Sequence, residues 1–158
     1  VEIHNTDAEG RLVMADAMCL ALEAKGADAP RYLIDVATLT GAVKVGLGAE
    51  IAGLFSNDDK LAATLAEAAT GRGDAMWRLP LFALYEMQLK SPVADLSNCS
   101  NSPFGGAISA ALFLKKFVGA TAWAHLDIYA WNDSPQGALR ESGGNGQAVQ
   151  GLISFLGG

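Results

Sequence analysis

Three charged side chains near the start of the chain have the types and spacing to bind a divalent cation and an anion together. Asp7, Glu9 and Arg11 alternate with other residues within Asn-Thr-Asp-Ala-Glu-Gly-Arg-Leu. In an extended backbone, residues two apart point to the same side at about 6.6 Å, so we expect all three to face one pocket. Carboxylate oxygens suit Mg, Mn or Zn, and a bridging carboxylate can hold two cations roughly 3.5–4 Å apart. A helix opening at Arg11 would add backbone N–H donors for an anion.

The same segment also fits a purely structural interpretation. Asp7 would then cap the helix that follows, Glu9 would complement the helix dipole from its first turn, and Arg11 would pair with both. A spacing of Asp-x-Glu is short and common, so spacing alone leaves both interpretations open.

Strands and helices alternate along the rest of the chain and must position this segment. We expect a strand end over 1–5, strands over 32–37, 51–55 and 122–129, and helices over 12–25, 61–69, 81–89, 108–118 and 147–156. The first helix carries apolar residues all round, which predicts burial on most of its faces. Between these elements we expect an aromatic connector over 77–80 and loops over 97–106 and 137–146. The alternation predicts an α/β sheet layered with helices.

Length and composition limit the classes of protein that remain. The chain has 158 residues, which is the size of one domain. Because 51% of its residues are hydrophobic and only 18% are charged, we expect it to bury surface against another part of a protein or another subunit. The net charge of −6 argues against a nucleic-acid or anionic-membrane partner. Apolar runs end well before the roughly 18 residues of a membrane span. Cys19 and Cys99 form no CxxC pair, which predicts reduced thiols.

The octapeptide 5–12 matches, at all eight positions, the signature of the leucine aminopeptidase (cytosol aminopeptidase) family of dinuclear metallopeptidases, which this chain resembles. Similar blocks follow in the family's order at 35–42, 53–58, 77–81 and 123–128. The resemblance implies an α/β domain whose mixed sheet is flanked by helices on both faces. It also implies a cytoplasmic enzyme, generally hexameric, that removes N-terminal residues from peptides with water activated by two divalent cations, Mn or Zn.

The resemblance assigns roles to individual positions. Asp7 and Glu9 would be metal ligands, with Glu9 bridging, and Arg11 would be the catalytic residue that holds a bicarbonate. Thr38, Leu39 and Gly41 would line the substrate cleft.

Two departures from the family pattern limit what the resemblance implies. The family completes its metal shell with a lysine and two aspartates, and adds a catalytic lysine, all upstream of the octapeptide, whereas this chain begins at Val1. We therefore expect 1–158 to be a single unit, the C-terminal portion of a peptidase catalytic domain from a longer chain. The alternative is a non-catalytic assembly or binding module, because the isolated chain would lack those ligands. Tyr129 and Ala130 replace a small pair of the family, which leaves a preference for leucine open.

Other polar residues are expected to act structurally. His125 lies in a strand pattern that favours a core histidine, and His4 precedes the octapeptide closely enough to approach the site. Asp35 and Asp127 lie in apolar strands, and buried carboxylates need partners, such as Arg78 or a backbone cap.

Overall fold

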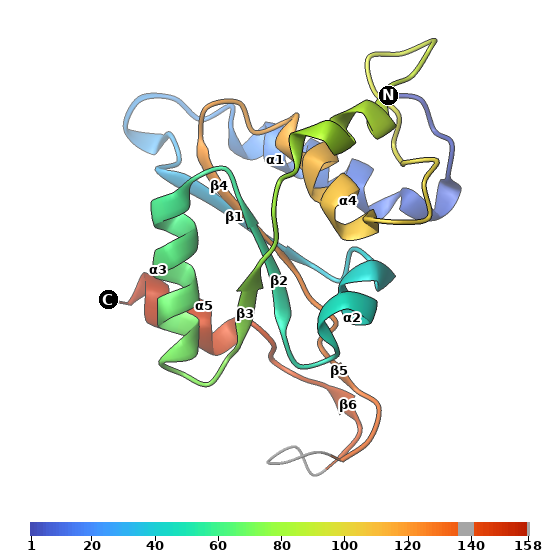
Figure 1. The fold of residues 1–158 in the computed structure, drawn as a ribbon. Helices are drawn as coiled ribbons and strands as arrows, with labels where there is room; N and C mark the ends of the chain where they lie inside the picture. The colour runs from blue at the N-terminus through green and yellow to red at the C-terminus, as the bar shows by residue number, and fades with distance from the viewer. Residues whose placement is uncertain (136–140, 158) are drawn as a thin grey trace.

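A four-stranded sheet forms the middle of three layers in the computed structural model, which describes residues 1–135 and 141–157 (Figure 1). The strands lie in the order β1-β4-β2-β3, with bounds β1 Tyr32–Ala37, β2 Ala52–Ser56, β3 Met76–Arg78 and β4 Ala122–Asp127. β1 runs parallel to β4 and β3 runs parallel to β2, while β2 and β4 are antiparallel. The prediction of a mixed sheet is therefore confirmed.

Helices cover both faces of this sheet (Figure 1). One face carries α1 (Gly10–Ala21), α2 (Gly41–Leu47), α4 (Gly106–Lys115) and the 3-10 helix η3 (Ala83–Leu89), and the other carries α3 (Asp59–Thr70) and α5 (Val149–Leu156). Successive residues of a strand point to opposite faces. Phe55 and Trp123 accordingly enter the first core, whereas Leu54 and Ala124 enter the second. The predicted layering of helices on both faces is confirmed.

Local capping explains where two of the helices begin. The Asp58 side chain accepts from the backbone N–H of Leu61 at 2.7 Å and opens α3. The Thr40 side chain accepts from the N–H of Val43 at 3.3 Å and opens α2. Both caps satisfy donors that the first turn of a helix leaves free.

The first helix is shorter and much less buried than its composition predicts. α1 ends at Ala21, and its buried residues are Arg11, Ala15 and Met18, a single stripe at helical spacing. Burial on most faces is therefore a wrong prediction. The helix packs on α4 by this one stripe, and apolar residues on its other faces, such as Val13 and Leu20, are exposed.

Short elements also differ from their predicted forms. The first two residues of the predicted aromatic connector over 77–80 belong to β3, because they pair with β2. The helix predicted over 81–89 is the 3-10 helix η3. In the described residues, the strand end over 1–5 is reduced to one bridge between Glu2 and Ser97. Residues 137–140 of the predicted loop over 137–146 lie outside the described residues. Residues 141–146 include the short strand β6 (Gly143–Gly144), which pairs with β5 (Trp131–Asn132). A short 3-10 helix, η2 (Gly26–Asp28), precedes β1. No helix among the described residues is long and apolar enough to cross a membrane.

Candidate active site

The octapeptide is a tight turn and not an extended segment. Thr6–Ala8 forms the 3-10 helix η1, and α1 follows directly from Gly10. The Asn5 side chain accepts from the N–H of Asp7 at 2.9 Å, which caps η1 and bends the chain. The expectation that residues two apart align on one side of a strand is therefore wrong. Asp7 and Glu9 lie on the surface, whereas Arg11 is only 9% exposed.

The two carboxylates have no protein partner among the described residues, so two parts of the purely structural interpretation, the cap by Asp7 and the pairing by Arg11, are wrong. Within residues 1–135 and 141–157, no hydrogen bond or ion pair engages the side chain of Asp7 or Glu9. Glu9 is the N-cap residue of α1 by position, but its side chain makes no capping bond, and Asp7 is not the cap. Arg11 pairs with neither of them. In the same residues there is no cluster of three His, Cys, Asp or Glu side chains that could hold a metal by itself.

Arg11 points into the protein beneath this turn. Its Nη1 donates to the backbone carbonyl of Asn98 at 2.8 Å, and its guanidinium carbon lies 6.0 Å from the centre of the Phe113 ring. Burial lowers the pKa of Arg11 from its ordinary value, opposed by the nearby Cys99 and Asp127. An arginine remains protonated in this situation. Its Nε is buried and has no partner among the described residues.

The segment Thr38–Gly41 leaves the carboxyl end of β1 and is anchored by Asp127 at the adjacent end of β4. One oxygen of the fully buried Asp127 accepts from the N–H groups of Leu39 and Thr40, each at 3.1 Å, and the other accepts from the Thr40 hydroxyl at 2.5 Å. Burial raises the pKa of Asp127, and these hydrogen bonds together with His125 oppose the rise. The backbone cap expected for Asp127 is confirmed, while pairing with Arg78 is wrong, because Arg78 pairs with Asp59.

The structure brings the two predicted site segments side by side. A Cβ atom placed on Gly10 would lie 3.6 Å from Cδ1 of Leu39, so the start of α1 packs against the Thr38–Gly41 segment. Thr38 and Gly41 are exposed, and Leu39 is half-buried in the core beneath them. Asp7, Glu9, Thr38 and Gly41 thus reach the surface from neighbouring segments, while Arg11 and Asp127 lie under it.

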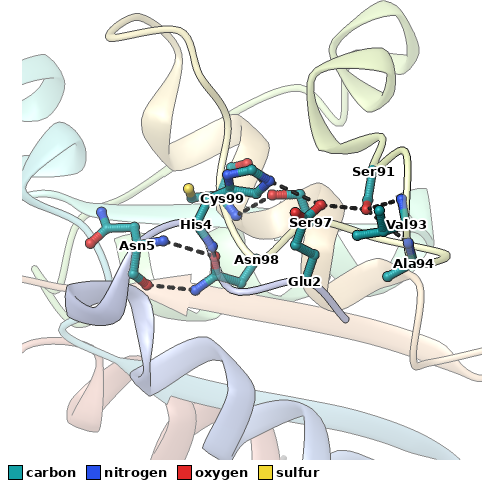
Figure 2. A network of polar contacts seen from close by, with 9 residues as sticks. All are labelled: Glu2, His4, Asn5, Ser91, Val93, Ala94, Ser97, Asn98 and Cys99. Carbon is teal, nitrogen blue, oxygen red and sulfur yellow. Dashed lines mark hydrogen bonds and ion pairs between the residues drawn. The ribbon is translucent and has the colours of Figure 1, made fainter.

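Asn98 is the residue of this region that the sequence did not predict. It lies within the expected loop over 97–106 and is fully buried, and its side chain contacts Asn5 of the octapeptide (Figure 2). Its backbone carbonyl accepts from Arg11. A lone asparagine in a loop gives no signal of such a role, because its partners lie about 90 residues earlier in the chain.

Asp35 is paired within the core, which confirms the structural pairing expected for it. His125 is fully buried between the Phe55 and Trp123 rings, and its Nδ1 lies 2.5 Å from Asp35. Asp35 also accepts from the Trp123 indole at 2.6 Å. His4 is exposed, and its Nε2 lies 3.0 Å from the Glu2 carboxylate. Cys19 and Cys99 are free thiols, as predicted.

The layered sheet is that of an α/β domain, in which the carboxylates at the head of α1 lie beside the segment that leaves β1. The chain belongs to the cytosol aminopeptidase family, since residues 1–153 match the model of that family's catalytic domain. A relative in Chlorobium luteolum, named as a probable cytosol aminopeptidase, is 50% identical over 157 residues, which is 99% of this chain and 30% of the relative.

Solved structures agree with this membership. The cytosol aminopeptidase from Coxiella burnetii superposes with a TM-score of 0.91 at 46% identity, over 99% of this chain and 34% of that one. The bottromycin maturation enzyme BotP in complex with Mn gives a TM-score of 0.92 at 44% identity, over 98% and 34%. The chain thus spans about a third of the length of the relatives that it matches.

Proposed function

We propose that the protein to which this chain belongs is a metal-dependent aminopeptidase that removes N-terminal residues from peptides. The observation that carries the proposal is the pair of surface carboxylates, Asp7 and Glu9, without any described protein partner, beside the exposed end of β1. Exposed carboxylates without a protein partner are available to coordinate a divalent cation through their oxygens. Relatives named as aminopeptidases, and the BotP structure with Mn, support the same function.

Asp7 and Glu9 fit divalent cations by their donor chemistry, because hard carboxylate oxygens suit Mn and Zn. When bound, two such cations would lower the pKa of a water molecule and polarise the scissile carbonyl of the peptide. Two carboxylates do not fill the coordination shells of two cations. We propose that the remaining ligands come from the two-thirds of the relatives' length that this chain does not cover.

Arg11 would hold a bicarbonate as the group that accepts a proton during the reaction. Its buried Nε is without a described partner, and the first turn of α1 adds free backbone N–H groups in the absence of a side-chain cap. Thr38, Leu39 and Gly41 would meet the peptide through their backbone groups, which Asp127 holds in place.

The alternative, a non-catalytic assembly module, applies to the 158 residues on their own. Exposed apolar side chains on α1, including Val13 and Leu20, support packing against the rest of the longer protein or against further subunits. We propose that 1–158 is the C-terminal portion of one catalytic domain, in a hexameric and cytoplasmic protein.

Glu9→Ala in the full-length protein tests the proposed function. We expect a more than 100-fold loss of turnover on an aminoacyl amide and a matching loss of Mn²⁺ affinity measured by calorimetry, because a bridging carboxylate disappears. Glu23→Ala is the matched control, since Glu23 is an exposed carboxylate beyond the end of α1. Undiminished turnover and Mn²⁺ binding in Glu9→Ala would contradict the assignment.

A further inference from the structure

Both the oxygen and the nitrogen of the Asn98 side chain form hydrogen bonds with the backbone of residues 4–8, of which Figure 2 shows His4 and Asn5. Its Oδ1 accepts from the N–H groups of His4 at 2.9 Å and Asn5 at 3.3 Å. Its Nδ2 donates to the carbonyls of Asn5 at 2.7 Å and Ala8 at 3.5 Å. A primary amide has two donor hydrogens and one acceptor oxygen, and this set of partners needs both kinds of group.

The backbone of Asn98 adds one contact before the octapeptide and one within it. Its N–H donates to the carbonyl of Glu2 at 2.9 Å, and its carbonyl accepts from Nη1 of Arg11 at 2.8 Å. The contacts at Ala8 and Arg11 lie on either side of Glu9, and those at Asn5 and Ala8 lie on either side of Asp7. Both candidate ligands are therefore held between fixed points, although their own side chains reach the surface.

The loop that carries Asn98 is itself well anchored. The Ser97 N–H donates to the carbonyl of Leu89 at 2.8 Å, and the Ser97 hydroxyl donates to the carbonyl of Cys99 at 2.9 Å. Further along, the Ser91 hydroxyl donates to the Glu2 carboxylate and accepts from two N–H groups of its own turn (Figure 2). Asn98 thus joins the anchored loop between η3 and α4 to the η1 turn that carries Asp7.

We propose that Asn98 is a positioning residue of the metal site, which fixes the backbone of Asp7 and Glu9 before a cation binds. The inference rests on the proposed function and adds to it a residue that does not touch the metal. When the turn is already ordered, metal binding does not carry the entropic cost of ordering the ligands. Mutation of residues that hold metal ligands in place typically lowers metal affinity about 10–100-fold.

Asn98→Ala in the full-length protein removes the side-chain contacts and leaves both backbone contacts possible. We expect the dissociation constant for Mn²⁺, followed by electron paramagnetic resonance, to rise at least tenfold. Asn57→Ala is the matched control. Asn57 also bridges two segments, donating to the Thr121 carbonyl at 2.9 Å and accepting from the Trp123 N–H at 2.8 Å, but contacts no residue of the octapeptide. It should lower the melting temperature without changing Mn²⁺ affinity more than twofold.

The outcomes separate this inference from the proposed function. If Glu9→Ala abolishes Mn²⁺ binding while Asn98→Ala binds Mn²⁺ like the wild type, the function stands and the role of Asn98 is refuted. If Glu9→Ala binds Mn²⁺ normally, both fail. Should Asn98→Ala not fold, hydrogen exchange of the metal-free wild type decides. Protection of the His4 and Asn5 amides before Mn²⁺ is added supports the inference, and protection that appears only with Mn²⁺ overturns it.

Discussion

Replacing Asp127 by asparagine should loosen the Thr38–Gly41 segment while leaving the sheet intact. The carboxylate joins the end of β4 to this segment through three hydrogen bonds, two from backbone N–H groups and one from the Thr40 hydroxyl. The amide that Asp127→Asn introduces can keep its oxygen toward the N–H groups of Leu39 and Thr40, because its shape is almost the same. Its nitrogen would then face the Thr40 hydroxyl.

The Thr40 hydroxyl determines the size of the effect. An amide nitrogen donates and does not accept, so in the variant the hydroxyl hydrogen loses the acceptor that the carboxylate provided, while the hydroxyl oxygen still accepts from the N–H of Val43 at 3.3 Å. A hydrogen bond to a charged group contributes about 1.5–3 kcal/mol. Part of that loss is offset, since the burial that raises the pKa of Asp127 no longer acts on a charge. A net cost of about 1–2 kcal/mol changes the ratio of anchored to released segment by roughly 5–30-fold.

Steady-state kinetics of the full-length protein on an aminoacyl amide provide the assay. We expect Asp127→Asn to raise KM by at most about 30-fold, since affinity falls only as the anchored fraction falls. The variant should change kcat by less than about threefold, because backbone groups that hold the peptide act equally in the ground and transition states. Asp74→Asn is the matched control. Asp74 accepts from the N–H groups of Ala148 and Gly151, each at 2.9 Å, and so anchors α5 on the opposite face of the sheet.

Both variants should lower the melting temperature, but Asp127→Asn alone should raise KM. Equal losses of melting temperature together with an unchanged KM in both variants would refute the reasoning. Asp127 would then stabilise the fold without positioning the Thr38–Gly41 segment for substrate.

Two further predictions concern packing and charge. Gly151→Ala should cost about 1–3 kcal/mol in urea unfolding, because its Cβ would lie 2.9 Å from Cβ of Ala69 and 3.1 Å from Cα of Ala69 in α3. In Gly46→Ala, in α2, the new Cβ meets nothing within 4 Å, so this variant should raise the free energy of unfolding by about 0.5–1 kcal/mol. Equal effects of the two substitutions would contradict this packing. The hydrogen bond from Lys116 lowers the pKa of Glu86 below its ordinary value of 4.5. That contribution, below about 1 kcal/mol, is present above pH 4.5 and is lost as pH falls through the lowered pKa. The difference in urea midpoint between wild type and Glu86→Gln should therefore shrink in acid, and a difference independent of pH would exclude the effect.

Much of the fold could be predicted because its signals are local. The run Tyr32–Ala37 is apolar and bounded by turn residues, and β1 has those bounds. Asp58 and Asp59 mark the start of α3, where Asp58 forms the cap. β3 could not be predicted from Met76–Arg78, since three residues carry no period and only the pairing with β2 makes them a strand.

The sequence proposes residues for the candidate site but does not predict their geometry. Alternating charges at Asp7, Glu9 and Arg11 suggested an extended segment, and the Asn5 side chain overrides that pattern by capping a tight turn. Arg11 therefore enters the core while the carboxylates stay outside. The partners that hold this arrangement, Asn98 and Asp127, lie about 90 residues away from the segments they anchor, and no local pattern connects such positions.

Asn98 and Asp127 use different chemistry for a reason that follows from what each must hold. The octapeptide offers both N–H and carbonyl groups, so a neutral amide satisfies it without bringing a charge beneath Asp7 and Glu9. The Thr38–Gly41 segment offers donors only, which a carboxylate matches best. A buried carboxylate is costly on its own. The donors of Leu39 and Thr40 meet that cost at Asp127. Arg11 binds the backbone carbonyl of Asn98, so the third charge of the motif is held inward by one of these anchors while the first two remain outside.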